Sequence, residues 1–583
     1  MQLKKSPTLR APVNTGFKAA LSVLTLTSCL AIGGVQAADT GPRHHAQGQY
    51  DTVTATYVVV EGDDLIAIGE RFEISVEALK ARNKLSSESI EIGDKLAIGD
   101  ADATPPTMKM TTPIPPSITT PDNVETSIGT LSFTDGLPDE ATVQKVYDNL
   151  DRQRGVEVFL NTMPGASINA IREGLRSQGV DNQTLVVFED LMDSKSLFLT
   201  PNTETVYLLG WLDLKDGPMV VETSPDILGI VDDHWFRYVA DLGNAGPDKG
   251  KGGKYLFVPP GYKGEIPDGY FVYHTPTYGN WIVGRGFLVD GSPKPAVASF
   301  KKTWRQYPLA KAANPPETKF IDVSGVNFNT IHPNTFQFYE DVNTIVQEEP
   351  SSAQEPELLG QLMAIGIEKG KPFAPDARMK KILTDAVAIG NATARAIEFR
   401  ARKEDVYYYP GKAWFAPGNP DGSYLWLHDG ARNLNARTRM FYGYTGVTPA
   451  MFLKMVGKGS QYAIAAVDAD KNYFDGAKTY ALHLPPNVPA KTFWSVVLYD
   501  TQTRSELQTD QRLPSTGSEK PDVKKNADGS YDVYFGPKAP PGKEGNWVQT
   551  VPGKSWWVIL RLYGALEPWF DKTWQPDDIK LFE

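Results

Sequence analysis

The chain has 583 residues, a formal net charge of −11 and one cysteine. This acidic balance argues against a nucleic-acid partner, because binding to phosphate backbones requires clustered positive charge. A lone cysteine cannot form an internal disulfide or a multi-thiolate metal site, so stability must come from packing. The 11% of aromatic residues, the 51 glycines and the 44 prolines favour a β-rich, turn-rich protein of several domains.

Residues 1–37 have the order of a secretory signal peptide. The first 18 residues contain four bases and no acid, an apolar run follows from Ala19 to Gly34, and Val35-Gln36-Ala37 is a small-residue cleavage site. The run is shorter than the ~20 residues needed to cross a bilayer, and no later segment reaches that length. We therefore expect an exported protein of the periplasm or cell wall, without a transmembrane segment.

A lipoprotein is the alternative form of export. Leu26-Thr27-Ser28-Cys29 resembles a lipoprotein processing box, which would leave a lipidated Cys29 at the start of the mature chain. Leu30-Ala31-Ile32 prolongs the apolar run beyond that cysteine, which favours cleavage after Ala37 instead.

Residues 55–98 predict a small unit of a strand, two helices and a strand. The pattern consists of an apolar strand at Tyr57–Val60, helical spacing of Leu65, Ile68 and Phe72, a second helix around Val76 and Leu79, and a closing turn and strand at Ile90–Ile98. Gly62-Asp63-Asp64 forms the turn that caps the first helix.

This unit resembles the LysM family along its whole length. The matching stretches are Tyr57–Leu65, Ile74–Leu79, Asn83–Leu85 and Ile92–Leu96. The resemblance implies a shallow groove whose backbone groups hydrogen-bond the N-acetyl groups of peptidoglycan or a chitin-like glycan. The implied glycan-binding residues are Gly62, Asp63, Asp64, Leu65, Leu85, Ser86 and Ile90. The alternative is a βααβ unit that binds nothing.

Residues 101–126 predict a semi-stiff linker. The segment is rich in Pro, Thr and Ser and has almost no aliphatic pattern. A glycan-binding module tethered to a larger body is the organisation that this linker suggests.

The body predicts helices, then short strands, then helices, then strands again. Helical spacing occurs over Val143–Leu150 and Ile168–Leu175, and strands are expected at 255–258, 271–273 and 281–288. Helices are expected at 356–367 and 379–400, the second with a buried stripe of Ile382, Ala386, Ile389, Thr393 and Ile397. The clearest later strands are 493–499 and 556–563, and Asn526–Gly529 signals a hairpin before Tyr531–Phe535.

These elements predict a fold that is mainly β with α. We expect two β-sandwich domains of the jelly-roll kind, over residues 140–345 and 441–583, joined by a helical segment over residues 346–440.

The body resembles the paired families called domain of unknown function 1254, in its N-terminal part, and 1214, in its C-terminal part. The matching stretches are Thr200–Tyr207, Phe328–Asn334, Asn435–Tyr442, Leu484–Ala490 with Phe493–Ser495, and Arg561–Gly564. The resemblance implies two β-sandwich domains and brings no function with it.

Asn202, Glu204 and Tyr207 are the first candidates for a site in the body. On an extended strand Asn202 and Glu204 share one face and Tyr207 lies on the other. A carboxylate beside an amide suits a metal, a sugar hydroxyl or a substrate proton. The alternative is a buried polar network that fixes the strand register. The chain has no standard hydrolase, zinc-protease, phosphate-loop or dinucleotide motif.

Two further positions complete the candidate set. His332 precedes a proline, and its imidazole suits a general base or a metal ligand, although a lone histidine more often satisfies a core hydrogen bond. Arg437 and Arg439 are expected on one face of a strand or beside a turn, where they suit carboxylate or phosphate recognition or form structural salt bridges. His234 is expected in an exposed loop, and Asp468–Gly476 is expected to be a hairpin turn rather than a calcium loop.

Two functions of different class follow for the body. In the first it is a hydrolase that acts on a glycan or a small molecule and uses Asn202, Glu204, Tyr207, His332 and Arg437. In the second it is a non-catalytic binding or scaffold module, and those residues are internal struts. Convergence of the residues on a water-accessible pocket distinguishes the two. The sequence assigns no metal and no cofactor, and it leaves open a homo-oligomer.

Overall fold

The computed structural model describes residues 48–51, 55–99, 109–402, 406–418 and 422–582. The predicted signal peptide and Cys29 lie outside these residues. The chain forms two compact units, the first from residues up to 125 with 131–139, the second from residues 126–130 with 140–583. Within the described ranges no helix is both long and apolar enough to cross a membrane.

The first unit contains the predicted strand, two helices and strand. These are β2 (Thr56–Val58), α1 (Leu65–Phe72), α2 (Val76–Asn83) and β3 (Lys95–Ala97), and the prediction is confirmed. A strand that the sequence did not predict, β1 (Gln49–Asp51), pairs with β2. The core of this unit is made only of its own side chains: Tyr57, Val59, Leu65, Ile68, Leu79, Leu96 and Ile98.

Asn83 ties the second helix of this unit to its last strand. The Asn83 Nδ2 donates to the carbonyls of Leu79 and Ala97 at 3.0 Å each, and its Oδ1 accepts from the Ala97 N–H at 2.6 Å. Since both the amide and the carbonyl of the side chain are used, Asn83 acts as a backbone clamp inside a small core.

A three-stranded sheet follows the Pro-rich segment. Its strands are β4 (Asn123–Thr126), β5 (Gly129–Thr134) and β6 (Leu137–Pro138), and a short 3-10 turn, η1 (Pro116–Ile118), precedes them. β4 therefore takes up the last residues of the segment in which the sequence predicted a linker.

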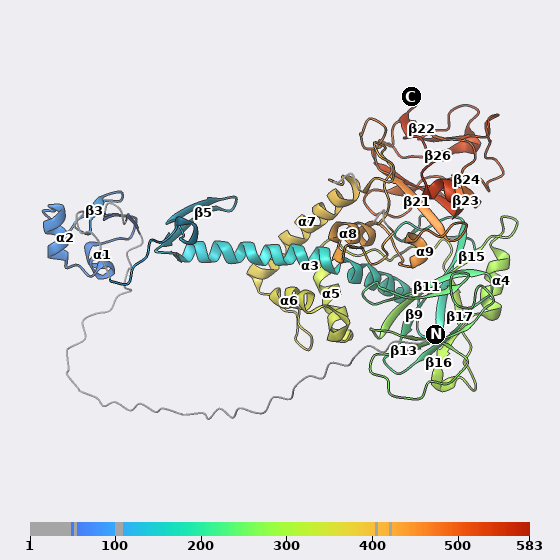
Figure 1. Ribbon diagram of the computed structural model, residues 1–583, viewed down its shortest axis with the longest axis horizontal. Helices are drawn as coiled ribbons and strands as arrows, with labels where there is room; N and C mark the ends of the chain where they lie inside the picture. Colours follow the sequence, from blue (N-terminus) through green and yellow to red (C-terminus); the bar gives the residue numbers. More distant parts are fainter. Residues whose placement is uncertain (1–47, 52–54, 100–108, 403–405, 419–421, 583) are drawn as a thin grey trace, which may run out of the picture. The chain divides into compact units, whose positions relative to one another are not determined.

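The helices of the second unit pack around one long helix. α3 (Glu140–Ser177) is a single helix of 38 residues where the sequence showed two separate periodic stretches. It contacts α5 (Gln337–Glu348), α6 (Pro356–Ala364), α7 (Ala377–Phe399) and α8 (Leu434–Gly443), as Figure 1 shows. The contact with α7 is close, because a Cβ on Gly155 would lie 2.7 Å from the Cβ of Ala386.

The buried stripe of α7 differs from the predicted stripe. Ile389 is exposed, whereas Ala386, Gly390, Ala394 and Glu398 are buried. Ala386 and Gly390, four positions apart, lie against α3, and their small size lets the two helices approach closely.

The N-terminal sandwich is made of a six-stranded and a four-stranded sheet. The larger has the order β12-β11-β15-β9-β7-β17 and the smaller β14-β13-β10-β16. The strands are β7 (Thr184–Val187), β9 (Thr205–Asp213), β10 (Met219–Glu222), β11 (Ile227–Asp233), β12 (Tyr238–Gly243), β13 (Lys254–Val258), β14 (Phe271–His274), β15 (Gly279–Phe287), β16 (Arg305–Pro308) and β17 (Lys319–Asp322).

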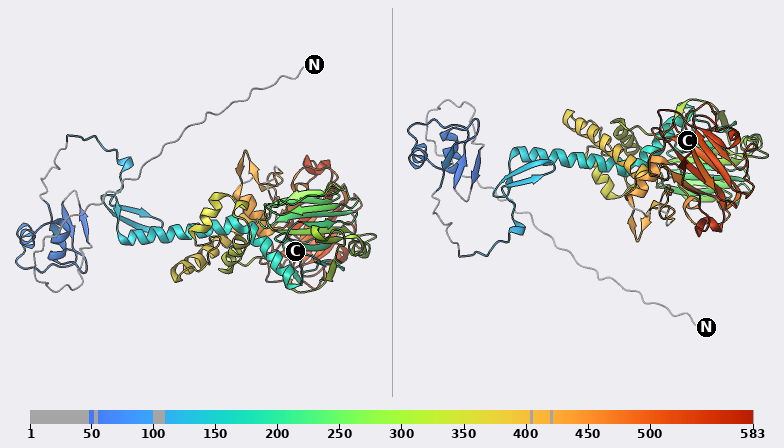
Figure 2. Two further views of the ribbon diagram at one scale, coloured as in Figure 1. Left: turned by 90° about the horizontal axis from the view of Figure 1, so that it is seen from below. Right: turned by 90° about the horizontal axis from the view of Figure 1, so that it is seen from above.

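The C-terminal sandwich is made of two four-stranded sheets, β21-β27-β23-β24 and β26-β25-β22-β28. The strands are β21 (Ser460–Ala465), β22 (Tyr480–Leu484), β23 (Ala490–Asp500), β24 (Ser515–Gly517), β25 (Tyr531–Gly536), β26 (Trp547–Gln549), β27 (Trp556–Ala565) and β28 (Lys580–Leu581). Figure 2 shows the strands of this sandwich in orange and red and those of the N-terminal sandwich in green. The prediction of two β-sandwiches joined by helices is confirmed.

The predicted hairpin at Asn526–Gly529 is wrong in part. The turn forms, and Gly529 adopts a φ of +90°. The strand before the turn, β24, pairs with β23, however, and β25 pairs with β22 and β26 instead. Shorter elements of the second unit are β8 (Ser196–Leu197), β18 (Phe328–Asn329), β19 (Leu427–His428), β20 (Ala431–Arg432), α4 (Lys294–Thr303), α9 (Pro449–Phe452), α10 (Glu567–Phe570), η2 (Leu309–Lys311), η3 (Ser351–Ala353) and η5 (Glu544–Asn546).

The central strand of each large sheet is buried on both faces. In β9, Val206 and Leu208 face the core of the N-terminal sandwich, whereas Leu209 belongs to a second core shared with the helices. In β27, Val558 faces the C-terminal sandwich core and Ile559 faces the same shared core. Because adjacent residues of a strand point to opposite faces, these strands are apolar at most positions.

We predict that limited trypsin digestion cuts first after Lys109. This residue is exposed and lies in the Pro/Thr-rich segment, where few contacts protect the backbone. The expected product is a stable body that begins at Met110, which N-terminal sequencing or mass spectrometry identifies. A first cut between residues 200 and 560 would contradict the tethered organisation.

Candidate functional site

The turn that opens α1 in the LysM-like unit is fixed by two carboxylates. Asp63 accepts hydrogen bonds from the Tyr57 hydroxyl at 2.7 Å and the Val60 N–H at 2.9 Å. Asp64 caps α1 by accepting from the Ala67 N–H at 2.7 Å. Burial, together with the hydrogen bond to Asp63, raises the pKa of Tyr57 to about 12, so its hydroxyl keeps its proton.

Some of the predicted glycan-binding residues belong to the core of the LysM-like unit, and others are exposed on its surface. Leu65 is buried, and Leu85 and Ile90 pack against the same core. Gly62, with a φ of +91°, and Ser86 are exposed. The two segments that the LysM resemblance assigns to the groove are therefore held by one core, and their backbone groups and small side chains face outward.

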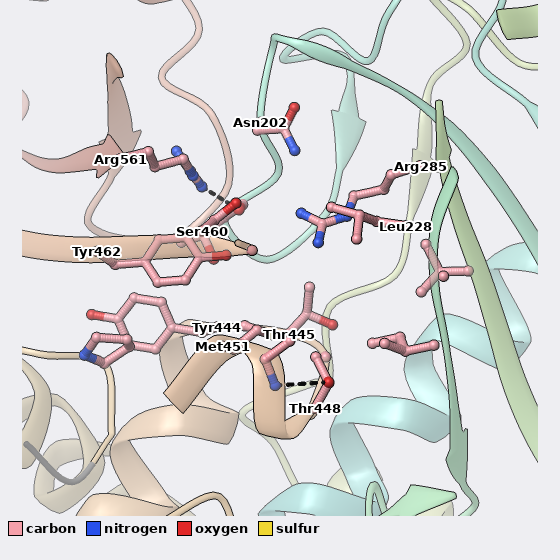
Figure 3. A pocket seen from close by; sticks show the side chains of 18 of the residues that line it. Asn202, Leu228, Arg285, Tyr444, Thr445, Thr448, Met451, Ser460, Tyr462 and Arg561 are labelled. Carbon is pink, nitrogen blue, oxygen red and sulfur yellow. Dashed lines mark hydrogen bonds between the residues drawn. The ribbon is translucent and has the colours of Figure 1, made fainter. Parts of the chain in front are cut away.

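The second unit contains a cavity between two sheets of different sandwiches: the six-stranded sheet that contains β9 and β15, and the four-stranded sheet that contains β21 and β27. It has about 930 Å³ of empty space, part of which is open to solvent. Polar side chains reach it from several sides, as Figure 3 shows. The polar lining residues are Thr200, Asn202, Tyr207, Asp241, Arg285, Tyr444, Thr445, Thr448, Ser460, Tyr462 and Arg561.

The period of two in the strands explains which side chains reach the cavity. Trp281, Val283 and Arg285 occupy every second position of β15, and Ser460 and Tyr462 are two positions apart on β21. Each set shares one face of its sheet. The cavity lies where the inner faces of the two sandwiches approach each other and is not completely filled by side chains.

Arg561 joins the C-terminal sandwich to the loop before β9. Its Nη1 donates to the Tyr499 hydroxyl at 2.6 Å, and its Nη2 donates to the carbonyls of Thr200 at 2.8 Å and Pro201 at 3.2 Å. Neutral oxygens thus hold this buried guanidinium, and no carboxylate in the described part of the chain lies within 4.0 Å of it.

Arg285 is the second cation of the cavity. Its half-buried guanidinium points toward the Tyr462 hydroxyl across the cavity (Figure 3). Among the described residues no carboxylate forms an ion pair with it. Because arginine does not lose its proton in proteins, the wall of the cavity carries a positive charge without a paired anion.

Asp241 is the acidic residue among those described that line the cavity. Its carboxyl accepts from the Thr448 hydroxyl at 2.5 Å and the Tyr238 hydroxyl at 3.3 Å. Burial raises the pKa of Asp241, although these hydrogen bonds and the charge of Arg285 act in the opposite direction.

Three polar atoms of the lining have no hydrogen-bond partner within the described residues: Ser460 Oγ, Thr445 Oγ1 and Trp281 Nε1. Buried polar groups are normally paired, and an unpaired one costs about 1–3 kcal/mol. Such groups in a cavity wall are suited to contact water or a bound molecule.

Two of the sequence candidates, Asn202 and Tyr207, meet at the cavity. Asn202 Nδ2 donates to the Tyr207 hydroxyl at 2.8 Å, and Asn202 Oδ1 accepts from the Glu204 N–H at 3.0 Å. The strand expected over 202–207 begins only at Thr205, because the Asn202 side chain folds back onto its own loop. Asn202 and Glu204 consequently do not share a strand face.

Glu204 lies behind the cavity wall rather than in it. Its Oε2 accepts from the Tyr563 hydroxyl at 3.3 Å, and its Oε1 accepts from the Thr203 hydroxyl. Glu204 therefore links the loop before β9 to β27, next to the link that Arg561 makes.

His332 and Arg437 do not line the cavity. The buried His332 ring packs against Phe338 and Tyr442, and burial lowers its pKa to about 3, so the imidazole is neutral. Arg437 lies on the helix α8, not on a strand or turn, and its Nη2 donates to Asn161 Oδ1 of α3 at 2.6 Å.

His234 is fully buried, so the expectation of an exposed loop is wrong. Its Nδ1 lies 2.7 Å from Glu349 Oε1, and Glu349 also accepts from the N–H groups of Tyr278 and Gly279. At the expected turn over 468–476, the Asp468 carboxylate accepts from the N–H groups of its own loop. The Asp468 carboxylate is thus satisfied by its own loop, and the Glu349 carboxylate is satisfied by groups that are distant in the chain.

Comparison with known families places named regions on this architecture. Residues 57–99 match the LysM domain, residues 182–308 match the protein family of unknown function DUF1254, and residues 459–567 match the protein family of unknown function DUF1214. The chain thus combines a LysM module with a double-sandwich body. In particular, it carries a LysM domain followed by DUF1254 and DUF1214 regions, as the sequence predicted.

Two solved structures are similar to the chain. The VPA0106 protein from Vibrio parahaemolyticus is 19% identical, with 75% of this chain and 100% of that chain covered and a TM-score of 0.47. A putative uncharacterized protein from Burkholderia cenocepacia is 12% identical, with 76% and 97% covered and a TM-score of 0.32. Among curated proteins, no match is found.

The sequence did not single out the arginines and the β21 hydroxyls of the cavity. A usable signal was present: Arg285 and Arg561 are single charges inside apolar strands that were predicted correctly. A charge in a strand buried on both faces needs a partner or a cavity. Ser460 and Tyr462 gave no comparable signal, because polar residues are common at the start of a strand.

Glu398 gives the second unit a pH dependence that can be tested. The Tyr444 hydroxyl, from a residue of the cavity lining, donates to Glu398 at 2.5 Å. Burial raises the pKa of this carboxyl to about 7, although Arg439 and the Tyr444 hydrogen bond lower it. In the unfolded chain the group titrates near its usual 4.5.

We predict that stability from Glu398 is fully present below about pH 4.5 and is lost as the pH rises through about 7, because the folded state binds the proton more tightly. The loss is roughly 3 kcal/mol. Glu398→Gln, which stays neutral, should flatten this part of the profile of unfolding free energy against pH. An unchanged slope between pH 5 and 8 would show that Glu398 is not the responsible group.

Proposed function

We propose that the protein is exported to the cell envelope, binds peptidoglycan through its LysM domain, and binds a small molecule in the cavity of its body. The LysM match over residues 57–99 supports the glycan partner. The basic and then apolar order of residues 1–37 supports export.

The convergence of Asn202, Tyr207, Arg285 and Arg561 on one cavity carries the proposal for the body. A scaffold would fill such a gap with apolar side chains, because unpaired polar atoms and unpaired charge reduce stability. A binding site of this kind combines apolar walls with a few convergent polar groups.

Hydrolysis of the bound molecule is the second candidate, and Asp241 favours it. A carboxyl with a raised pKa in a cavity is suited to give a proton to a leaving group. Asp241→Asn should lower the turnover of any ester or glycoside found in a substrate screen by 100-fold or more. Unchanged turnover in this variant would contradict the role of Asp241 as the proton donor.

We predict that residues 48–99 fold alone and sediment with insoluble peptidoglycan or chitin, since their core is self-contained. Ser86→Trp should weaken sedimentation by placing a large side chain at the exposed groove segment without touching the core. Glu70→Trp, an exposed position in the last turn of α1, is the matched control and should behave like the unchanged fragment. A fragment that is folded by circular dichroism but stays in the supernatant at low and moderate salt would refute the glycan partner.

A further inference from the structure

We infer that the cavity of the second unit takes a small organic anion: one carboxylate attached to an aliphatic or aromatic body. The inference rests on the proposed role of the cavity as a binding site, and it specifies the chemistry of the ligand. It is carried by the arrangement of charge, hydroxyl groups and apolar walls around the empty space.

The charge balance of the lining is positive. Arg285 and Arg561 both line the cavity, and neither forms an ion pair with a described carboxylate. Asp241, the acidic lining residue, accepts hydrogen bonds from two hydroxyls, so those donors occupy part of its carboxyl. A negatively charged group is therefore the missing partner of the cavity.

Arg285 is the guanidinium better placed to bind this anion, because it forms no ion pair with a described carboxylate and its polar neighbour is the neutral Tyr462 hydroxyl. The Arg561 donors are already engaged by Tyr499, Thr200 and Pro201, and these bonds fix it as part of the wall. Arg285 instead points into the space from β15 (Figure 3). A guanidinium binds the two oxygens of a carboxylate through parallel N–H groups, so one arginine matches one carboxylate.

Hydroxyl groups lie on the opposite side of the same space. Tyr462 faces Arg285 across the cavity, and the neighbouring Ser460 is 3% exposed with an Oγ that has no partner among the described residues. Thr445 Oγ1 is likewise buried without a partner in the described ranges. Ser460 and Thr445 supply further donors for the carboxylate oxygens from groups that the protein itself leaves unpaired, whereas the Tyr462 hydroxyl is shared with Arg285.

The remaining walls are apolar. They are formed by Phe198, Leu228, Ile230, Trp281, Val283, Met440, Met451 and Ile559. A free mineral anion such as phosphate would leave these side chains against water. An aliphatic or aromatic body attached to the carboxylate would instead bury them, at about 25 cal/mol per Å² of apolar surface removed from water.

The test uses the purified full chain and measures binding by calorimetry and by the shift of the melting temperature. The probes are octanoate and benzoate, their uncharged amides octanamide and benzamide, and inorganic phosphate. We expect at least one carboxylate to bind at least 10-fold more tightly than its amide and than phosphate. Arg285→Gln should remove that preference, and Ser460→Ala should weaken carboxylate binding several-fold.

Arg176→Gln, an exposed arginine on α3, is the matched control and should leave binding unchanged. If Arg285→Gln does not fold, Arg285→Lys takes its place in the test. It keeps the positive charge but not the two parallel N–H groups, so it should bind the carboxylate more weakly. Amides or phosphate that bind as tightly as the carboxylates, or carboxylate binding unaffected by both Arg285 variants, would overturn the inference and leave the cavity a binding site for another class. Failure of these probes and of a wider panel of neutral molecules would overturn the proposed binding function as well.

Discussion

The structure of the body depends on two large sheets that are buried on both faces. One face of each sheet packs into the core of its own sandwich. The other face packs into a shared core, to which α3, α7 and α8 also contribute side chains. A strand with two buried faces has no solvent-exposed position for a charge. Every polar residue on the inner faces must therefore find a partner or a space within the protein.

The cavity is a consequence of that constraint. The two inner faces come from different sandwiches, and their side chains leave part of the space between them unfilled. Arg561 and Glu204 each connect β27 to the loop before β9, one through backbone carbonyls and the other through hydroxyls. These links fix the distance between the sheets, and Arg285 and Ser460 remain beside the unfilled space.

Local patterns in the sequence predicted the elements but not their contacts. Alternation and apolar runs identified β13, β15, β23 and β27, because each depends on residues close in the chain. The extent of α3 was missed because its middle is buried around Pro164 and does not show one polar face. The site was predicted in part: Asn202 and Tyr207 meet through a local turn, whereas the partners Arg285 and Tyr462 are brought together only by the packing of separate sheets.

The lining of the cavity draws on both matched regions of the body. Tyr207, Asp241 and Arg285 lie within the DUF1254 match, and Ser460 and Arg561 lie within the DUF1214 match. Met440 and the residues 444–448 belong to neither match and close the cavity from the connecting segment. Neither matched region alone has both the Arg285 guanidinium and the hydroxyls of Ser460 and Tyr462, so the proposed anion site is a property of the assembled body. The LysM domain needs no such assembly, because its core is complete within residues 48–99. One chain thus combines a locally encoded glycan module with a site that only long-range packing creates.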